Sequence, residues 1–162
     1  GRVFKQRKNV KFLPAGDERI RPLLRLPQDR VIFQPYVMWH DWPRVMTKMD
    51  IVVAPLFGRY DASRSSIKSM ESCIMGLPFV ATGSPTYQDW MNEKIGLYVN
   101  DGPIEELKDR ATIWEQKLLD VIDHYSEYRD EMASHLDYAM SWDVDANVKY
   151  IEGVYQEIID KR

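Results

Sequence analysis

The sequence lacks several features that would each assign it to a particular class of protein. It has one cysteine, Cys73, which excludes an intramolecular disulfide and suits a reducing compartment. No apolar run approaches the ~18–20 residues that span a bilayer. The net charge of -3 gives no reason to expect a nucleic-acid partner. No group of His, Cys and acidic residues has metal-ligand spacing, so we predict no metal and no other cofactor.

What remains is the composition of a globular protein, with 44% apolar and 29% charged residues in a 162-residue chain. Short and nearly continuous apolar runs recur with helical patterns between them, as is typical of strands buried on both faces of a parallel sheet. These runs are Val10–Leu13, Val31–Phe33, Ile51–Leu56, Pro78–Thr82 and Gly96–Val99. After Asp101 the pattern is helical to the end of the chain. We therefore predict one α/β domain over 1–162, a Rossmann-like open parallel sheet flanked by helices, with further helices at its C-terminal end.

The segment "SSIKSMESCIM" predicts a helix that Gly76 and Pro78 end. Its positions Lys68 and Glu71 share one helical face with Arg64. The apolar residues form a separate stripe, made of Ile67, Met70 and Ile74. An arbitrary Lys-x-x-Glu pair is usually a solvated ion pair worth ~0.2–0.5 kcal/mol. The context of this pair favours a ligand site instead.

This helix follows the strand Ile51–Leu56, and ligands bind beyond the carboxyl ends of parallel strands. A helix start there offers backbone N–H groups and the positive end of the helix dipole, which suits phosphate. The neighbouring hydroxyls and positive charges belong to Arg59, Arg64, Ser65, Ser66 and Lys68. One turn further, Glu71 could accept hydrogen bonds from vicinal hydroxyls. A diphosphate beside a diol indicates a nucleotide-sugar.

The stretch "SSIKSMESCIMGLPFVATGSPTYQDW" resembles the donor-binding half of GT-B glycosyltransferases, in the group 1, or family 4-like, retaining enzymes. Members commonly show S-x-x-K-x-x-E-x-x-x-x-G-x-P-V-V-A. Those places are filled here by Ser65, Lys68, Glu71, Gly76, Pro78, Val80 and Ala81. The likeness extends from about Asn9 to Ile159. It implies that the chain is the C-terminal half of a GT-B fold.

The resemblance also implies roles for individual residues. Diphosphate binding falls to Arg64, Ser65, Ser66 and Lys68, and ribose binding to Glu71. Tyr36 and Val37 would lie near the base. Arg59 and Ser63 would lie near the donor sugar, although many members carry a second glutamate at the place of Ser63. Transfer would proceed with retention and without a metal, since basic residues and the helix dipole stabilise the departing diphosphate.

In such enzymes a further strand with a glycine-rich loop and an acceptor-binding domain precede the part that matches here. We therefore expect this chain to be a fragment that holds part of a nucleotide-sugar and is inactive alone, with the catalytic residues outside it. Its acceptor, a sugar, lipid or protein, would bind through the missing N-terminal domain. We expect a cytoplasmic protein, or one that is peripheral on the inner face of a membrane.

Two other functions stay open at this point, a non-catalytic binding or assembly module with a GT-B-like fold and a nucleotide-sugar epimerase of the same fold. The remaining candidate residues have more ordinary interpretations. His40 is expected at the surface, Cys73 as a buried thiol, and the five tryptophans as packing residues. Tyr87 is expected near the ligand, since it follows the strand Pro78–Thr82. Gly16, a single glycine in "AGDER", is too little for a dinucleotide fingerprint.

Overall fold

The computed structural model describes residues 1–55, 65–83, 87, 97–99 and 107–160. Its main sheet is parallel, in the order β3-β4-β5. The strands are β3 (Val52–Ala54), β4 (Phe79–Thr82) and β5 (Leu97–Val99). The central strand β4 is buried along Phe79, Val80 and Ala81. This agrees with the prediction from its continuous apolar run.

A second, smaller parallel sheet pairs β1 (Ala15–Gly16) with β2 (Gln34–Pro35). A parallel bridge between Phe12 and Val31 precedes it along the chain. The main-chain hydrogen bonds continue between these segments, with the Gln34 N–H donated to the Pro14 carbonyl at 3.0 Å. Because Pro14 and Pro35 have no N–H to donate, the main-chain hydrogen bonds between these two segments form only short ladders. The two strands predicted at Val10–Leu13 and Val31–Phe33 are therefore misplaced: β1 and β2 follow those runs, which the bridge between Phe12 and Val31 alone joins in the described chain.

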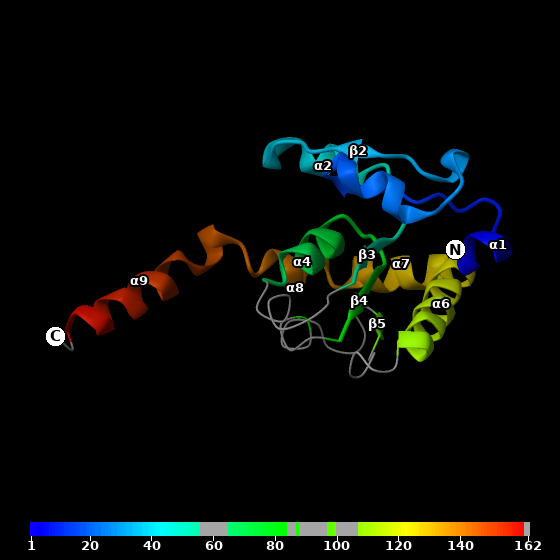
Figure 1. The fold of residues 1–162 in the computed structure, drawn as a ribbon. Coiled ribbons are helices and arrows are strands. Elements are labelled where there is room, and N and C mark those ends of the chain that lie inside the picture. Colours follow the sequence, from blue (N-terminus) through cyan, green and yellow to red (C-terminus); the bar gives the residue numbers. More distant parts are fainter. Residues whose placement is uncertain (56–64, 84–86, 88–96, 100–106, 161–162) are drawn as a thin grey trace.

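Short helices accompany this small sheet in the first 50 residues. Most of this segment forms an N-terminal layer that lies apart from the main sheet in Figure 1, whereas the first helix lies against α6 (Leu107–Asp123), with ion pairs from Arg2 to Glu115 and from Arg7 to Asp123. These helices are α1 (Arg2–Gln6), η1 (Glu18–Leu24), η2 (Gln28–Arg30), η3 (Trp39–Asp41) and α2 (Trp42–Met46). The η helices are of the 3₁₀ type. Pro22 lies inside η1, where its missing N–H and its ring disfavour a longer α-helix.

Helix α4 (Ile67–Ile74) connects β3 to β4, as predicted. Gly76 follows its C-terminal end, and the φ of +62° at Gly76 is the left-handed conformation that glycine adopts without strain. The apolar stripe of Ile67, Met70 and Ile74 is not the buried face of α4: Ile67 and Ile74 are 55% and 45% exposed, while Met70 packs against the core. The residues of α4 that are buried are Ser69, Ser72 and Cys73.

The C-terminal part of the described chain is helical, as predicted. It consists of α6 (Leu107–Asp123), α7 (Tyr125–Ser134), α8 (Leu136–Met140) and α9 (Val144–Asp160). Asp143 accepts the backbone N–H of Asp145 at 3.1 Å, which satisfies a donor at the start of α9. Helix α9 projects away from the rest of the molecule (Figure 1). Among the described helices, none is both long and apolar enough to cross a membrane.

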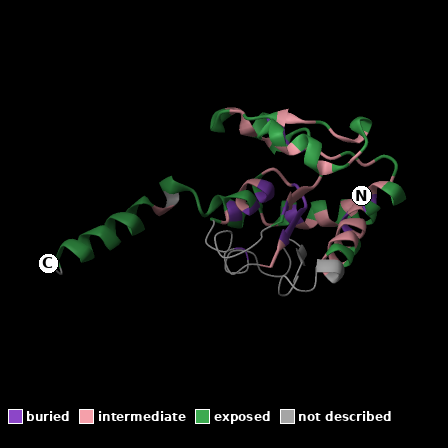
Figure 2. Cartoon of the chain, in the orientation of Figure 1, coloured by how far each residue is buried: buried purple, intermediate pink, exposed green. Residues whose placement is uncertain are grey.

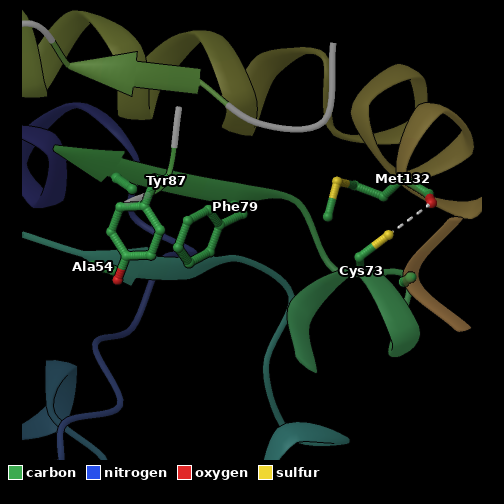
Figure 3. Packing of buried hydrophobic residues seen from close by; sticks show 7 residues of the cluster. Ala54, Cys73, Phe79, Tyr87 and Met132 are labelled. Carbon is green, nitrogen blue, oxygen red and sulfur yellow. Dashed lines mark hydrogen bonds between the residues drawn. The ribbon is translucent and has the colours of Figure 1, made fainter. Parts of the chain in front are cut away.

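The core lies where α4, the main sheet and the C-terminal helices meet (Figure 2). Its largest cluster consists of Ala54, Cys73, Phe79, Ala81, Tyr87, Met132 and Ala139. Tyr87 is 1% exposed and packs edge-to-face on Phe79, with ring centroids 5.3 Å apart (Figure 3). The expectation of Tyr87 beside a ligand is therefore wrong, because its ring fills the core. The α/β class with short parallel sheets and flanking helices is confirmed.

Candidate functional site

A cavity of about 300 Å³ lies between the N-terminal layer and α4. Strand β1, the end of β2 with the two residues after it, η3, the start of α2 and one residue of α4 form its walls. They are Ala15, Gly16, Pro35, Tyr36, Val37, Trp39, Trp42 and Glu71. Ligand pockets typically measure about 300–1,000 Å³, so this volume is at the lower limit of that range. The predicted residues Tyr36, Val37 and Glu71 therefore meet at one cavity.

Glu71 contributes the acidic group of this cavity. Its carboxylate Oε2 accepts the indole N–H of Trp42 at 3.1 Å. Burial raises the pKa of Glu71, while the hydrogen bond from Trp42 and the charge of Lys68 act in the opposite direction. A half-buried carboxylate that already accepts one hydrogen bond, here from Trp42, can accept further hydrogen bonds from the hydroxyl groups of a ligand.

The start of α4 carries the remaining described candidates. Ser66 is the N-cap residue, and its hydroxyl makes no capping hydrogen bond. Its carbonyl instead accepts the Ser69 hydroxyl at 2.6 Å and the Ser69 N–H at 2.9 Å. Ser65 and Lys68 are exposed, with Lys68 one turn before Glu71 on α4. The other three predicted residues, Arg59, Ser63 and Arg64, lie outside the described residues.

Five residues of the cavity were not predicted as site residues, namely Ala15, Gly16, Pro35, Trp39 and Trp42. Gly16 has a φ of +126°, a conformation that side-chain-bearing residues rarely adopt, so bare backbone forms this part of the wall. Its position three residues after the predicted strand Val10–Leu13 was the available signal. Trp39 is 79% exposed, and Trp42 contacts Glu71. The interpretation of the tryptophans as packing residues is wrong for these two, whereas Trp114 does pack against the Val80–Val121 cluster.

A second cavity of similar volume lies on α6 and α7 and is lined by Asp120, His124, Glu127, Tyr128 and Glu131. The Tyr128 hydroxyl donates to Asp120 at 2.8 Å, and burial with this bond raises the pKa of Tyr128 to about 12. Hydrogen bonding to the Asp120 carbonyl, with nearby acidic charges, also raises the pKa of His124. Three carboxylates against one imidazole make this cavity unsuited to a diphosphate.

The other candidates behave as ordinary structural residues. The buried Cys73 thiol donates to the carbonyls of His135 and Met132, at 3.5 and 3.7 Å, and burial raises its pKa (Figure 3). A thiol with a raised pKa is a poor nucleophile. His40 is exposed and lies 3.4 Å from the Asp41 carboxylate. Within the described ranges, no cluster of three or more His, Cys or acidic side chains could hold a metal ion.

The described geometry defines a class of protein: an α/β domain with a parallel sheet and a cavity beside the helix that follows β3. A comparison with protein families gives a more specific assignment. The model for group 1 glycosyl transferases matches residues 2–114, well over half of the chain. The chain therefore belongs to the group 1 glycosyltransferase family. A search of curated proteins found no match.

Proposed function

We propose that this chain is the donor-binding domain of a retaining glycosyltransferase with a GT-B fold and that it binds a nucleotide-diphosphate sugar beside α4. The observation that carries the proposal is the cavity in which Tyr36, Val37 and Glu71 come together from separate elements. The resemblance to GT-B glycosyltransferases implies that Tyr36 and Val37 lie near the base and that Glu71 binds the ribose. Membership of the glycosyltransferase family supports the same reaction.

In this proposal the cavity holds the nucleoside and Glu71 accepts its ribose hydroxyls. The diphosphate lies toward the start of α4, where Ser65, Ser66 and the Lys68 ammonium are placed and where the helix dipole is positive. Transfer breaks the bond from the anomeric carbon to the diphosphate oxygen, which keeps the electron pair. The acceptor oxygen bonds to that carbon and loses its proton. Positive groups at α4 stabilise the departing diphosphate.

Calorimetric titration of the purified chain with uridine, guanosine and adenosine diphosphates tests this site. Glu71→Ala and Lys68→Ala should each weaken binding of the preferred nucleotide by about 1–3 kcal/mol, the range for a lost hydrogen bond to a charged group. A matched control exists on α9, where Lys149 and Glu152 have the same spacing and both are exposed. Lys149→Ala and Glu152→Ala should leave binding unchanged. Equal affinity in all five proteins would refute the site.

Turnover then distinguishes the functions. A longer protein that contains this chain, incubated with nucleotide-sugars, should transfer the sugar with its anomeric configuration retained, as proton NMR of the product shows. Release of free, epimerised sugar would favour a nucleotide-sugar epimerase. Binding without any turnover would favour a non-catalytic module.

A further inference from the structure

The hydrogen bond between Trp42 and Glu71 joins the two halves of the cavity. Trp42 is the first residue of α2, in the N-terminal layer, whereas Glu71 lies 29 positions later, in the middle of α4. Both side chains line the cavity and both are half-buried. A contact between residues so distant in sequence follows from the fold and not from local structure.

The chemistry of the two groups fixes which one donates the hydrogen bond and which one accepts it. An indole N–H only donates, so it bonds to the carboxylate and offers no acceptor that competes for a ligand. The bond uses one acceptor position of Oε2 and restrains the carboxylate, which leaves Oε1 and the second lone pair of Oε2 for ligand hydroxyls. It also favours the charged form of Glu71 against the effect of burial. The charged form is the acceptor-only form that a diol requires.

We propose that Trp42 is a positioning residue that holds Glu71 in the orientation and charge state needed to bind ligand hydroxyls. This inference rests on the proposed function, in which the hydroxyls belong to the ribose of a nucleoside diphosphate. It adds a residue outside the helix that carries the predicted site.

The contact itself is tested without any ligand. In ¹H–¹⁵N spectra of the unmodified chain, the indole resonance of Trp42, identified by its absence in Trp42→Phe, should shift as Glu71 titrates. Glu71→Gln should abolish that shift. Trp42→Phe should raise the pKa of Glu71, because it removes the hydrogen bond that counteracts the effect of burial. The ¹³C chemical shift of the Glu71 carboxyl, measured as a function of pH, reports this pKa. Neither variant alters Lys68, one turn away on α4, so the effect of its charge on Glu71 stays the same. If the chemical shift of the Trp42 indole N–H changes neither with pH nor on Glu71→Gln, the proposal is overturned.

Binding then tests the role. The chain is titrated with the preferred nucleoside diphosphate and with its 2′-deoxy counterpart. Trp42→Phe should weaken binding of the ribonucleotide about tenfold and reduce the preference over the deoxy form. If Trp42 acts through Glu71, the double variant Trp42→Phe/Glu71→Gln binds no more weakly than Glu71→Gln alone. Trp142→Phe, the same chemical change at a half-exposed tryptophan before α9, is the control.

The outcomes separate the two proposals. If the unmodified chain binds no nucleoside diphosphate, the proposed function fails and the ligand role of Trp42 fails with it. If the chain binds and Glu71→Gln weakens binding, but Trp42→Phe binds as tightly as the unmodified chain, only the inference about Trp42 fails. Additive losses in the double variant would also overturn it, since Trp42 would then act independently of Glu71.

Discussion

The N-terminal layer and the region from β3 to β4 differ sharply in how they are packed. Among the first 50 residues, the buried ones are Val3, Pro14, Val45 and Met46. From Leu77 to Ala81, by contrast, every residue is buried. Figure 2 shows the same division, with buried residues concentrated on β4 and α4. The second region has the character of a core, and the first that of a cover laid over one side of it.

Helix α4 belongs to both regions. Ser69, Ser72 and Cys73 pack toward the core, and the Ser72 hydroxyl is satisfied by the Leu77 carbonyl at 3.0 Å. Glu71, on another side of the same helix, lines the cavity. The small buried residues of α4 therefore hold the helix against the core. The same helix presents the charged Glu71 to the less densely packed N-terminal layer. A rigid support of this kind suits a binding residue.

The largest expected effect tests the difference in packing directly. Phe79→Ala removes a 2% exposed ring from the centre of the main sheet and should lower the free energy of unfolding by about 3–5 kcal/mol. Phe33→Ala, at a half-buried ring in the N-terminal layer, should cost less than about 2 kcal/mol. Urea unfolding followed by circular dichroism measures both. Equal losses would contradict the division into core and cover.

A smaller effect concerns the end of α4. Gly76→Ala should destabilise the protein by about 1 kcal/mol, because alanine is strained at a φ of +62° although its Cβ would meet nothing within 4 Å. Gly153 lies inside α9, and a Cβ there also meets nothing within 4 Å. Gly153→Ala should therefore have the opposite sign and favour the helix by about 0.5–1 kcal/mol. Thermal unfolding, with helicity from far-ultraviolet circular dichroism, distinguishes the two. A stabilising Gly76→Ala would show that the left-handed turn is not needed.

The smallest expected effect is a dependence on pH at the junction of the regions. Burial raises the pKa of Glu71 in the folded protein above its value in the unfolded chain. The folded state then binds the proton more tightly, so stability from this group is present at low pH and is lost as pH rises through the folded pKa. Glu71→Gln cannot ionise. Its melting temperature relative to the unmodified protein should rise with pH across that window.

Glu152→Gln, at an exposed glutamate on α9, provides the control and should show no such trend. A melting-temperature difference for Glu71→Gln that stays constant from acid to neutral pH would show that burial does not act on this carboxyl. Such a result would also weaken the argument that Trp42 maintains its charge.

Much of the fold could be predicted because its signals are local. The continuous apolar run Pro78–Thr82 indicated a fully buried strand, and Gly76 marked the end of the preceding helix. The short strands of the N-terminal layer were harder, because Pro14 and Pro35 interrupt a ladder that the apolar runs alone would extend. The candidate site could be predicted in part. Glu71, Tyr36 and Val37 reach the same cavity, whereas Trp42 gave no sequence signal because its partner lies 29 residues away.

The sequence by itself determined the α/β class, the order of the elements and the helix that carries Lys68 and Glu71. Hydrophobic runs and the backbone limits of glycine and proline act over a few residues, so they can be read along the chain. Only the tertiary structure decided which side of that helix is buried, where Tyr87 packs and which residue holds Glu71. Periodicity shows which side chains share a face, but the neighbour that covers the face is chosen by packing across the whole chain. For α4 that packing favoured two serines and a cysteine over two isoleucines, and it placed a tryptophan against the glutamate.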